Sequence, residues 1–369
     1  MGPLAGVRVV ELAGLGPGPF AGMLLADLGA TVVRIDRPDK AGTGGPTEVM
    51  GRGKESVCLD LKTAAGRDEA FALIAAADVV IEGFRPGVME RLGLGPDDVL
   101  ARSPHIVYGR MTGWGQTGPA ALTAGHDITY LALTGALGAI GRADGPPQVP
   151  LNLLGDFGGG AMLLVVGVLA ALHHVAAGGP GQVVDGAIVD GVELLASQLW
   201  GAKAAGRWRD QRGVNRLDTG WPHYDVYETA DHLWMAVGAL EKKFFDAFLD
   251  GLGLAEWSDA HEDESRWPAL HDAIAARFAT RTRAQWCGVF AGTDACVAPV
   301  LTWDEAAEHP HLVARRTVVD VAGVRQPAPA PRFSATPLGP PRPAPTVGAP
   351  RSVCADRPEV RSGSQRAKV

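Results

Sequence analysis

The chain has 369 residues, of which 46% are hydrophobic, 20% charged and 6% aromatic, and its formal net charge is −7. This length suggests about two domains and suffices for a large buried core. The acidic balance excludes a basic footprint for nucleic acid, so no nucleic-acid partner is expected. With 49 glycines and 27 prolines the composition stays below the range typical of low-complexity disorder, and it excludes collagen, a coiled coil and a disulfide scaffold.

The cysteines indicate a reducing compartment, and the length of the apolar segments argues against a membrane span. The four cysteines contain no CxxC pair and are too few to staple a chain of this size. The longest apolar stretch, residues 157–172, is 16 residues long, shorter than a membrane span, and predicts a buried helix. The first residues lack the basic region of a signal peptide and lead directly into a strand. We expect a cytoplasmic protein without a membrane partner.

Strands and helices alternate along the first third of the chain. Residues 7–12 predict a buried strand, followed by a glycine cluster over 13–19, a helix over 20–28 and a strand over 31–35. The alternation continues with strands over 56–61, 79–82 and 106–111 and helices over 64–77 and 88–92. Apolar, non-alternating strands between helices are typical of a parallel sheet with helices on both faces. The predicted fold class is therefore α/β, with an open parallel sheet.

After Gly125 the pattern changes. Helices are predicted over residues 127–140, 157–174 and 189–205, then a hairpin of strands over 223–229 and 233–238, then helices over 241–252, 267–280 and 284–292. We expect a large domain over 1–205, a linker over 206–221, a small α+β domain over 222–315, and a return segment with a Pro-rich tail over 316–369. That last part packs on the large domain or is partly disordered, because ten of the prolines lie between Pro327 and Pro358.

The first glycine cluster has two interpretations. It follows a strand, precedes a helix and has Asp36 downstream, as a dinucleotide-binding fingerprint does. Its spacing is GxGxG, however, and Pro17 and Pro19 remove two N–H groups that would hold a pyrophosphate. Tight packing of strand against helix is therefore favoured over a nucleotide site.

Four cations follow successive predicted strands: Arg37, Lys62, Arg85 and Arg91. In an open α/β sheet ligands bind at the carboxyl ends of the strands, and arginine forks hold phosphates well. Each cation alone is equally well explained as solvated surface charge. Together they favour a phosphorylated carrier as the ligand.

Three residues are candidates for acid–base chemistry. His126 opens a predicted apolar helix, where the helix dipole favours its neutral form and free N–H groups could hold an oxyanion, although a structural role is the commoner one. Asp156 lies between glycines before the next helix and is either a buried acid with a raised pKa or an ionised N-cap. Glu241 follows the hairpin and is otherwise a first-turn acid. The remaining histidines lack metal-ligand spacing, so no metal is expected.

Several separate motifs resemble the family III CoA-transferases, over residues 3 to 335. They are VVEL at 9–12, ADLGA at 26–30, VRID at 33–36, RGK at 52–54, LDLK at 59–62, EGFRPG at 82–87 and GWGQTGP at 113–119. Within that superfamily three blocks are similar to the α-methylacyl-CoA racemases: GHDITY at 125–130, NLLGDFGGG at 152–160, and YETAD at 227–231 leading to VGALE at 237–241.

The resemblance implies a Rossmann-like large domain and an interlocked homodimer whose active site joins one protomer's large domain to its partner's small domain. His126 and Asp156 would epimerise the α-carbon of a 2-methylacyl-CoA through an enolate, and Glu241 would orient His126. No cofactor is needed beyond the CoA of the substrate. Contacts to CoA and the thioester are implied for Arg37, Leu59, Asp60, Leu61, Lys62, Gly83, Arg85, Arg91, Gly125, Asp127, Ile128, Thr129 and Tyr130.

The alternative within the same resemblance is CoA transfer, with Asp156 as the nucleophile of an acyl-enzyme anhydride. Transferases commonly lack histidine at the position of His126 and carry a glycine-rich loop where this chain has GALEK at 238–242. Epimerisation is therefore favoured. The chain departs from the family in Lys242-Lys243, where Pro-Gln is usual, and in Trp221-Pro222-His223, which the resemblance places near the acyl pocket.

Overall fold

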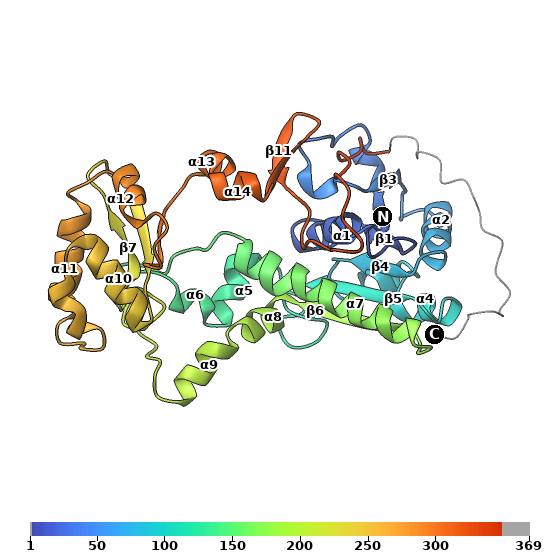
Figure 1. Cartoon of the computed structure of the whole chain (residues 1–369). Coiled ribbons are helices and arrows are strands. Elements are labelled where there is room, and N and C mark those ends of the chain that lie inside the picture. Colours follow the sequence, from blue (N-terminus) through green and yellow to red (C-terminus); the bar gives the residue numbers. More distant parts are fainter. Residues whose placement is uncertain (1, 349–369) are drawn as a thin grey trace. The chain divides into compact units, whose positions relative to one another are not determined.

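The computed structural model describes residues 2–348 (Figure 1). The chain forms two compact units, each discontinuous in sequence. The first unit contains residues up to 122, 160–187 and those from 319 onward, and the second contains 123–159 and 188–318. The linear domains expected from the sequence are divided differently, because residues 123–159 and 188–205 group with the small sheet; those domain boundaries stay a prediction.

The first unit is built on a six-stranded, fully parallel sheet. Its strands are β1 (Arg8–Leu12), β2 (Thr31–Asp36), β3 (Glu55–Cys58), β4 (Val79–Glu82), β5 (Val107–Thr112) and β6 (Gln182–Ala187), in the order β3-β2-β1-β4-β5-β6. In the centre Val10 pairs with Val33 on one side and Val80 on the other. The predicted α/β class and its five strands are confirmed. The sixth strand was not predicted, since QVVDGA has only a short apolar run.

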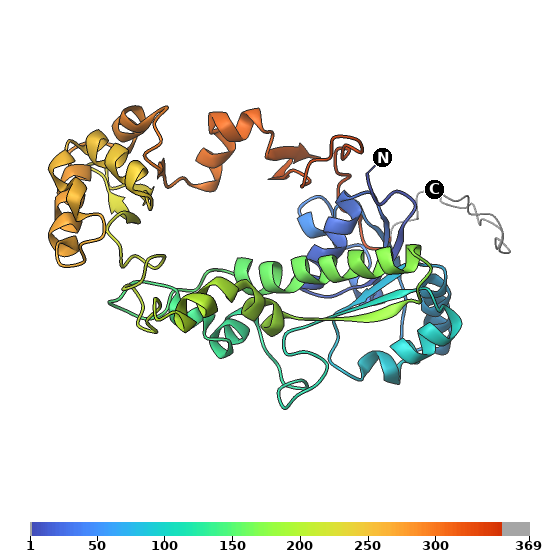
Figure 2. The ribbon, with the colours of Figure 1, turned by 60° about the horizontal axis from the view of Figure 1, so that its bottom comes forward.

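Helices cover both faces of this sheet. On one face α2 (Ala64–Ala75), α3 (Val88–Arg91) and α4 (Pro96–Arg102) form a core with Val10, Val80 and the buried Tyr108. On the other face lie α1 (Pro17–Asp27) and α7 (Leu163–Ala176), and Figure 2 shows α7 running along the strands. A Cβ on Gly186 would lie 3.0 Å from Leu164, so the glycine lets α7 approach β6 closely.

The apolar helix is longer than the sequence indicated. A π-helix (Leu153–Met162) runs directly into α7, giving 24 residues, Leu153–Ala176, with mean hydropathy 1.9. The helix is thus long and apolar enough to cross a membrane, and the expectation of a shorter one was wrong. In this chain 39% of its most apolar window is buried, including Leu164 and Val168 against the sheet. Core helices of water-exposed proteins pass the same test of length and composition.

Two other predicted helices are each broken into two. The predicted helix over 127–140 is α5 (Asp127–Leu133) and α6 (Ala136–Ala139), separated at Gly135, whose φ of 81° interrupts the helix. The predicted helix over 189–205 is α8 (Ile188–Leu195) and α9 (Ser197–Ala204).

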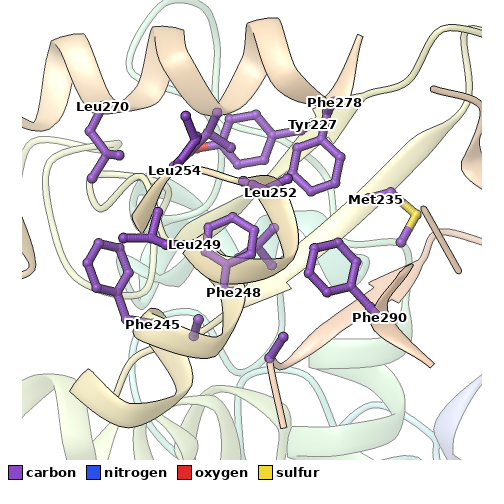
Figure 3. Packing of buried hydrophobic residues seen from close by; sticks show 14 of the residues in the cluster. Tyr227, Met235, Phe245, Phe248, Leu249, Leu252, Leu254, Leu270, Phe278 and Phe290 are labelled. Carbon is purple, nitrogen blue, oxygen red and sulfur yellow. The ribbon is translucent and has the colours of Figure 1, made fainter. Parts of the chain in front are cut away.

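The second unit contains a small antiparallel sheet covered by helices. Strands β7 (Tyr224–Glu228) and β8 (Trp234–Gly238) form the predicted hairpin, and β9 (Val297–Pro299) pairs with β8. Helices α10 (Lys242–Leu252), α11 (Trp267–Phe278) and α12 (Arg283–Phe290) enclose an aromatic core, in which Phe248, Phe278 and Phe290 lie together (Figure 3). Further elements are α13 (Trp303–Glu308), α14 (Pro310–Ala314), β10 (Val318–Val321) and β11 (Val324–Pro327), with 3-10 turns at Pro38–Lys40, Val49–Gly51 and Ala255–Ala260.

The return segment makes both side-chain and backbone hydrogen bonds to the rest of the first unit. Arg52 donates to the Gln326 side chain at 3.0 Å, and Gly53 N–H donates to Arg342 O at 2.9 Å. Gly348 N–H donates to Ser56 Oγ at 3.1 Å. The segment therefore lies on the first unit up to residue 348. The remainder of the predicted Pro-rich tail, 349–369, lies outside the described residues.

Candidate active site

His126 immediately precedes α5 and serves as its N-cap residue through its backbone. Its carbonyl oxygen accepts from Thr129 N–H at 2.8 Å, and its own N–H donates to Thr129 Oγ1 at 3.0 Å. The imidazole is exposed, so the ring is accessible for chemistry.

Asp127 is the first residue of α5, but its carboxylate accepts hydrogen bonds from the backbone of another segment, the π-helix. It is buried, and its Oδ1 accepts from Asp156 N–H at 2.6 Å; the N–H of Gly155 also donates to this carboxylate. Its Oδ2 is buried without a hydrogen-bond partner among the described residues. Burial raises the pKa of Asp127, while the two backbone N–H groups oppose that rise.

The glycines beside Asp156 are required by close approaches. A Cβ on Gly155 would lie 2.3 Å from Asp127 Oδ1, so the carboxylate occupies the space of a side chain. At the next turn of the π-helix a Cβ on Gly191 would lie 1.8 Å from Gly159 O, so α8 packs backbone to backbone against this helix. Gly155 and Gly191 thus stand where another segment approaches the backbone closely.

Asp156 lies inside the π-helix and is not an N-cap. The i→i+5 pattern is seen where Phe157 N–H donates to Asn152 O at 3.2 Å. Burial raises the pKa of the half-buried Asp156, and the charge of Asp127 raises it further, while a hydrogen bond from the Asn152 side chain and the nearby His126 lower it. π-helical turns recur at functional sites. Of the two interpretations left open by the sequence, the structure favours the acid with a raised pKa.

Tyr130 completes the cluster from inside α5. A Cβ on Gly125 would lie 2.5 Å from its ring, so Gly125 makes room for the phenol. Burial raises the pKa of Tyr130, and the charges of Asp156 and Asp127 raise it further. Four of the predicted site residues thus interact here: His126, Asp127, Tyr130 and Asp156.

Glu241 is placed elsewhere on the second unit. It is exposed and is the N-cap residue of α10, where its backbone oxygen accepts from Phe244 and Phe245 N–H groups at 2.9 Å. In the described part of the chain no hydrogen bond joins it to His126. Burial raises the pKa of Cys296, and the charges of Glu241 and Asp294 raise it further. The expected role of Glu241 in orienting His126 stays a prediction.

The predicted CoA-binding cations belong to the first unit. Arg37 follows β2, Lys62 follows β3 and Arg85 follows β4, so all three leave the same carboxyl edge of the parallel sheet. Arg37 is exposed, and its Nη2 lies 3.2 Å from Asp39 Oδ2. Arg91 is the last residue of α3. Of the other expected contacts, Leu59 is buried, whereas Asp60, Lys62, Gly83 and Arg85 are exposed.

A buried ion pair lies beside α1. Lys54 Nζ donates to Glu11 Oε2 at 2.6 Å and to Pro19 O at 2.8 Å, and this pair is fully buried. A Cβ on Gly22 would lie 1.8 Å from Glu11 Oε2, so this glycine makes room for the pair. A Cβ on Gly18 would have no atom within 4 Å, so the packing interpretation of the cluster over 13–19 stays a prediction. The described residues hold no group of three or more His, Cys, Asp or Glu that could bind a metal.

The parts played by Asn152 and by the Asp127 carboxylate were not predicted from the sequence. Asn152 was part of a recognised motif, but the predicted helix begins at residue 157, and only a helical turn that begins earlier brings residue 152 next to the Asp156 side chain four positions on. A signal for Asp127 was present in Gly155, because a glycine beside a candidate acid indicates a close neighbour.

The family model described as CoA-transferase family III matches residues 4–351. The chain belongs to CoA-transferase family III. Within this family it is 47% identical over 339 residues to a Mus musculus protein named Alpha-methylacyl-CoA racemase, and 44% identical over 345 residues to the Homo sapiens protein of that name. Each match covers 91% of this chain and 88% of the relative. A solved structure of a hypothetical protein from Mycobacterium tuberculosis has a TM-score of 0.79 and 27% identity, covering 94% of this chain and 97% of that one. The family expected from the sequence motifs is confirmed.

Proposed function

We propose that this protein epimerises the α-carbon of 2-methylacyl-CoA thioesters by a two-base 1,1-proton transfer. The observation that carries the proposal is the placement of an exposed imidazole, His126, beside a half-buried Asp156 whose pKa is raised. The racemase name of the mouse and human relatives, which match nearly the whole chain, supports the same reaction.

Two groups of different basicity suit the reaction. In one direction neutral His126 removes the α-proton, the C–H electron pair moves into the enolate, and protonated Asp156 delivers a proton to the opposite face of the α-carbon. In the other direction the aspartate carboxylate removes the proton and the imidazolium returns one. A raised pKa keeps a share of Asp156 protonated nearer neutral pH, as the first direction requires. Side chains supply both proton transfers, so we propose that no cofactor takes part.

Hydrogen exchange at the α-carbon tests this function. A single epimer of a 2-methylacyl-CoA is incubated with the enzyme in D₂O, and deuterium incorporation and configuration are followed together. We expect deuterium at the α-carbon with loss of configuration. His126→Ala and Asp156→Asn should each lower racemisation by about 10² to 10⁴-fold. Wild-type enzyme that leaves both the α-proton and the configuration intact would refute the proposal.

CoA transfer is the second candidate, because the family is described by that reaction and Asp156 is accessible as a nucleophile. Its carboxylate would attack the thioester carbonyl, release CoA thiolate and leave a mixed anhydride. The same incubation separates the two reactions when a free carboxylic acid and hydroxylamine are added. Transfer of CoA to the acid, with a hydroxamate formed at Asp156 and no α-exchange, would establish the transferase.

We propose that CoA is held by the cations at the carboxyl edge of the parallel sheet. Arg37, Lys62 and Arg85 leave β2, β3 and β4 at that edge, and β1 and β4 form the point where the strand order reverses. Ligands of open α/β sheets bind at such a point. Guanidinium groups suit the phosphates of CoA because they donate in pairs.

We also propose a homodimer. Large apolar side chains on α5, α8 and α9 are more than half exposed in the single chain: Leu133 at 71%, Leu194 at 58%, Leu195 at 55% and Trp200 at 56%. A surface of this kind is typical of an interface between copies. Light scattering coupled to size exclusion tests the state, and a monomer at micromolar concentration would refute it.

A further inference from the structure

Asp127 makes an unusual pair of contacts for a residue in the first turn of a helix. A first-turn acid ordinarily interacts with N–H groups of its own helix. The buried carboxylate of Asp127 instead accepts from Asp156 N–H at 2.6 Å and from Gly155 N–H, which belong to the π-helix. The residue next to one candidate base therefore holds the backbone of the other.

The Asp127 carboxylate occupies the space that a side chain at position 155 would fill. The three nearest atoms to a Cβ built on Gly155 all belong to Asp127, namely Oδ1 at 2.3 Å, Cγ at 2.8 Å and Oδ2 at 3.2 Å. Other backbone or side-chain atoms lie farther away. A methyl group at position 155 and a carboxylate at position 127 thus exclude each other.

We propose that Asp127 is a positioning residue. Its buried carboxylate packs against Gly155 and accepts from the Asp156 N–H, and this contact fixes the Asp156 side chain relative to His126. This inference rests on the proposed epimerisation and deepens it. Near-attack geometry is sensitive, and a displacement of about 1 Å can cost 10²-fold in rate.

The charge of Asp127 adds a second effect on the same residue. The groups that act on the Asp156 carboxyl are Asp127, His126 and the Asn152 side chain, with Tyr130 alongside. Of these, Asp127 raises the pKa of Asp156, whereas His126 and Asn152 lower it. A negative charge at 127 therefore favours the protonated form of Asp156, which is the form that delivers a proton to the enolate.

Three variants separate position from charge. Asp127→Asn keeps an oxygen acceptor at the same place and removes the charge, Asp127→Ala removes both, and Gly155→Ala displaces the carboxylate. Gly138→Ala is the matched glycine control, because a Cβ there has no atom within 4 Å. Asp144→Asn is the matched charge control, because Asp144 is exposed in the same unit.

For rates, we expect Asp127→Ala and Gly155→Ala each to lower kcat for α-proton exchange by roughly 10²-fold with KM changed less than about threefold. The double variant should be no slower than Asp127→Ala alone, because the group that the new methyl displaces is already gone. Losses that multiply in the double variant would overturn the proposal, as would a Gly155→Ala enzyme as fast as Gly138→Ala.

To test the effect of charge, kcat is measured as a function of pH. We expect Asp127→Asn to shift the limb of this pH profile that reflects the ionisation of Asp156 to lower pH by about one unit. Asp144→Asn should leave it in place. An unshifted limb in Asp127→Asn would refute the effect of charge.

Two readouts do not require the proposed reaction. Amide hydrogen exchange of a peptide containing Asp156 should be faster in Asp127→Ala than in wild type and unchanged in Asp127→Asn, since the amide retains an acceptor. Carbon-13 titration of the Asp156 carboxyl, assigned with Asp156→Asn, should show a lower pKa in Asp127→Asn. If wild type exchanges no α-proton, the proposed function fails while these measurements still decide the role of Asp127. Unchanged amide exchange in a folded Asp127→Ala protein would overturn it.

Discussion

Arg142 forms a bidentate ion pair, a fork, with the buried carboxylate of Asp225. Its Nη1 lies 2.7 Å from Oδ2 and its Nη2 lies 2.6 Å from Oδ1, while His271 Nε2 lies 3.6 Å from Oδ2. Arg142 belongs to the loop between α6 and the π-helix, and Asp225 to β7. The fork therefore ties the segment that carries Asp156 to the small sheet of the same unit.

Removing this fork should destabilise the protein. We expect Arg142→Ala to lower the free energy of unfolding by about 1.5 to 3 kcal/mol, because Asp225 is left buried with less compensation. Urea unfolding measures the loss. Lys203→Ala is the control, since Lys203 and Asp210 form an exposed pair at 2.7 Å that should contribute about 0 to 1 kcal/mol. Equal effects of the two substitutions would contradict the prediction.

His223 should make the protein sensitive to mild acid. Its ring is 0% exposed, packs against Phe245 and His261, and has neither nitrogen hydrogen-bonded within the described chain. Burial lowers the pKa of His223 from 6.5 to about 3, with the charges of His261 and Arg216 adding to the effect. The unfolded chain therefore binds a proton below pH 6.5 that the folded chain does not, and stability falls as pH drops from 6.5 toward 3.

The substitution His223→Phe tests this. Between pH 7.5 and pH 5.5 the wild type should lose up to about 1.4 kcal/mol more stability than the variant, the amount that one pH unit below 6.5 contributes for one proton. Thermal unfolding at both pH values gives the comparison. His105→Phe, at an exposed histidine, is the control. Equal pH dependence of wild type and His223→Phe would show that the ring is protonated normally in the folded state.

A site shared between two protomers predicts complementation. If His126 of one chain works with Glu241 of its partner, His126→Ala and Glu241→Ala homodimers are each inactive, but their mixed dimer contains one site with both native residues. Co-expression with two different affinity tags isolates the mixed dimer. We expect about half of the wild-type exchange activity per dimer, since one of its two sites is intact. Activity no higher than that of the single-variant homodimers would place both residues in one chain's site.

The cations at the carboxyl edge predict a defect in CoA binding. Arg85→Ala should raise KM for an acyl-CoA by about tenfold at unchanged kcat, as expected for losing a charge-assisted hydrogen bond of about 1.5 kcal/mol. The increase should shrink with added salt. Arg8→Ala is the control, because Arg8 begins β1 at the opposite edge of the sheet and pairs with Asp78. A similar KM for the two variants would argue against CoA at the carboxyl edge.

Much of the fold follows from local pattern. Buried β-branched runs such as VRVVEL and TVVRID form strands wherever they are covered by helices, so the sheet was predictable. Strand β6 was missed because its sequence has few apolar residues, and only pairing with β5 makes it a strand. The break between α5 and α6 was missed because Gly135 at a φ of 81° is indistinguishable in sequence from a glycine inside a helix.

The sequence by itself determined the family, the parallel sheet and the identity of the candidate acid–base residues, because these depend on short motifs and on hydrophobic periodicity. Tertiary structure alone decided how those residues are held. A hydrogen bond between residues 29 positions apart joins the Asp127 carboxylate to the Asp156 backbone. Such contacts depend on distances between segments, which no local pattern encodes. The same reason explains why the sequence does not show that the Asp127 carboxylate fills the space beside Gly155.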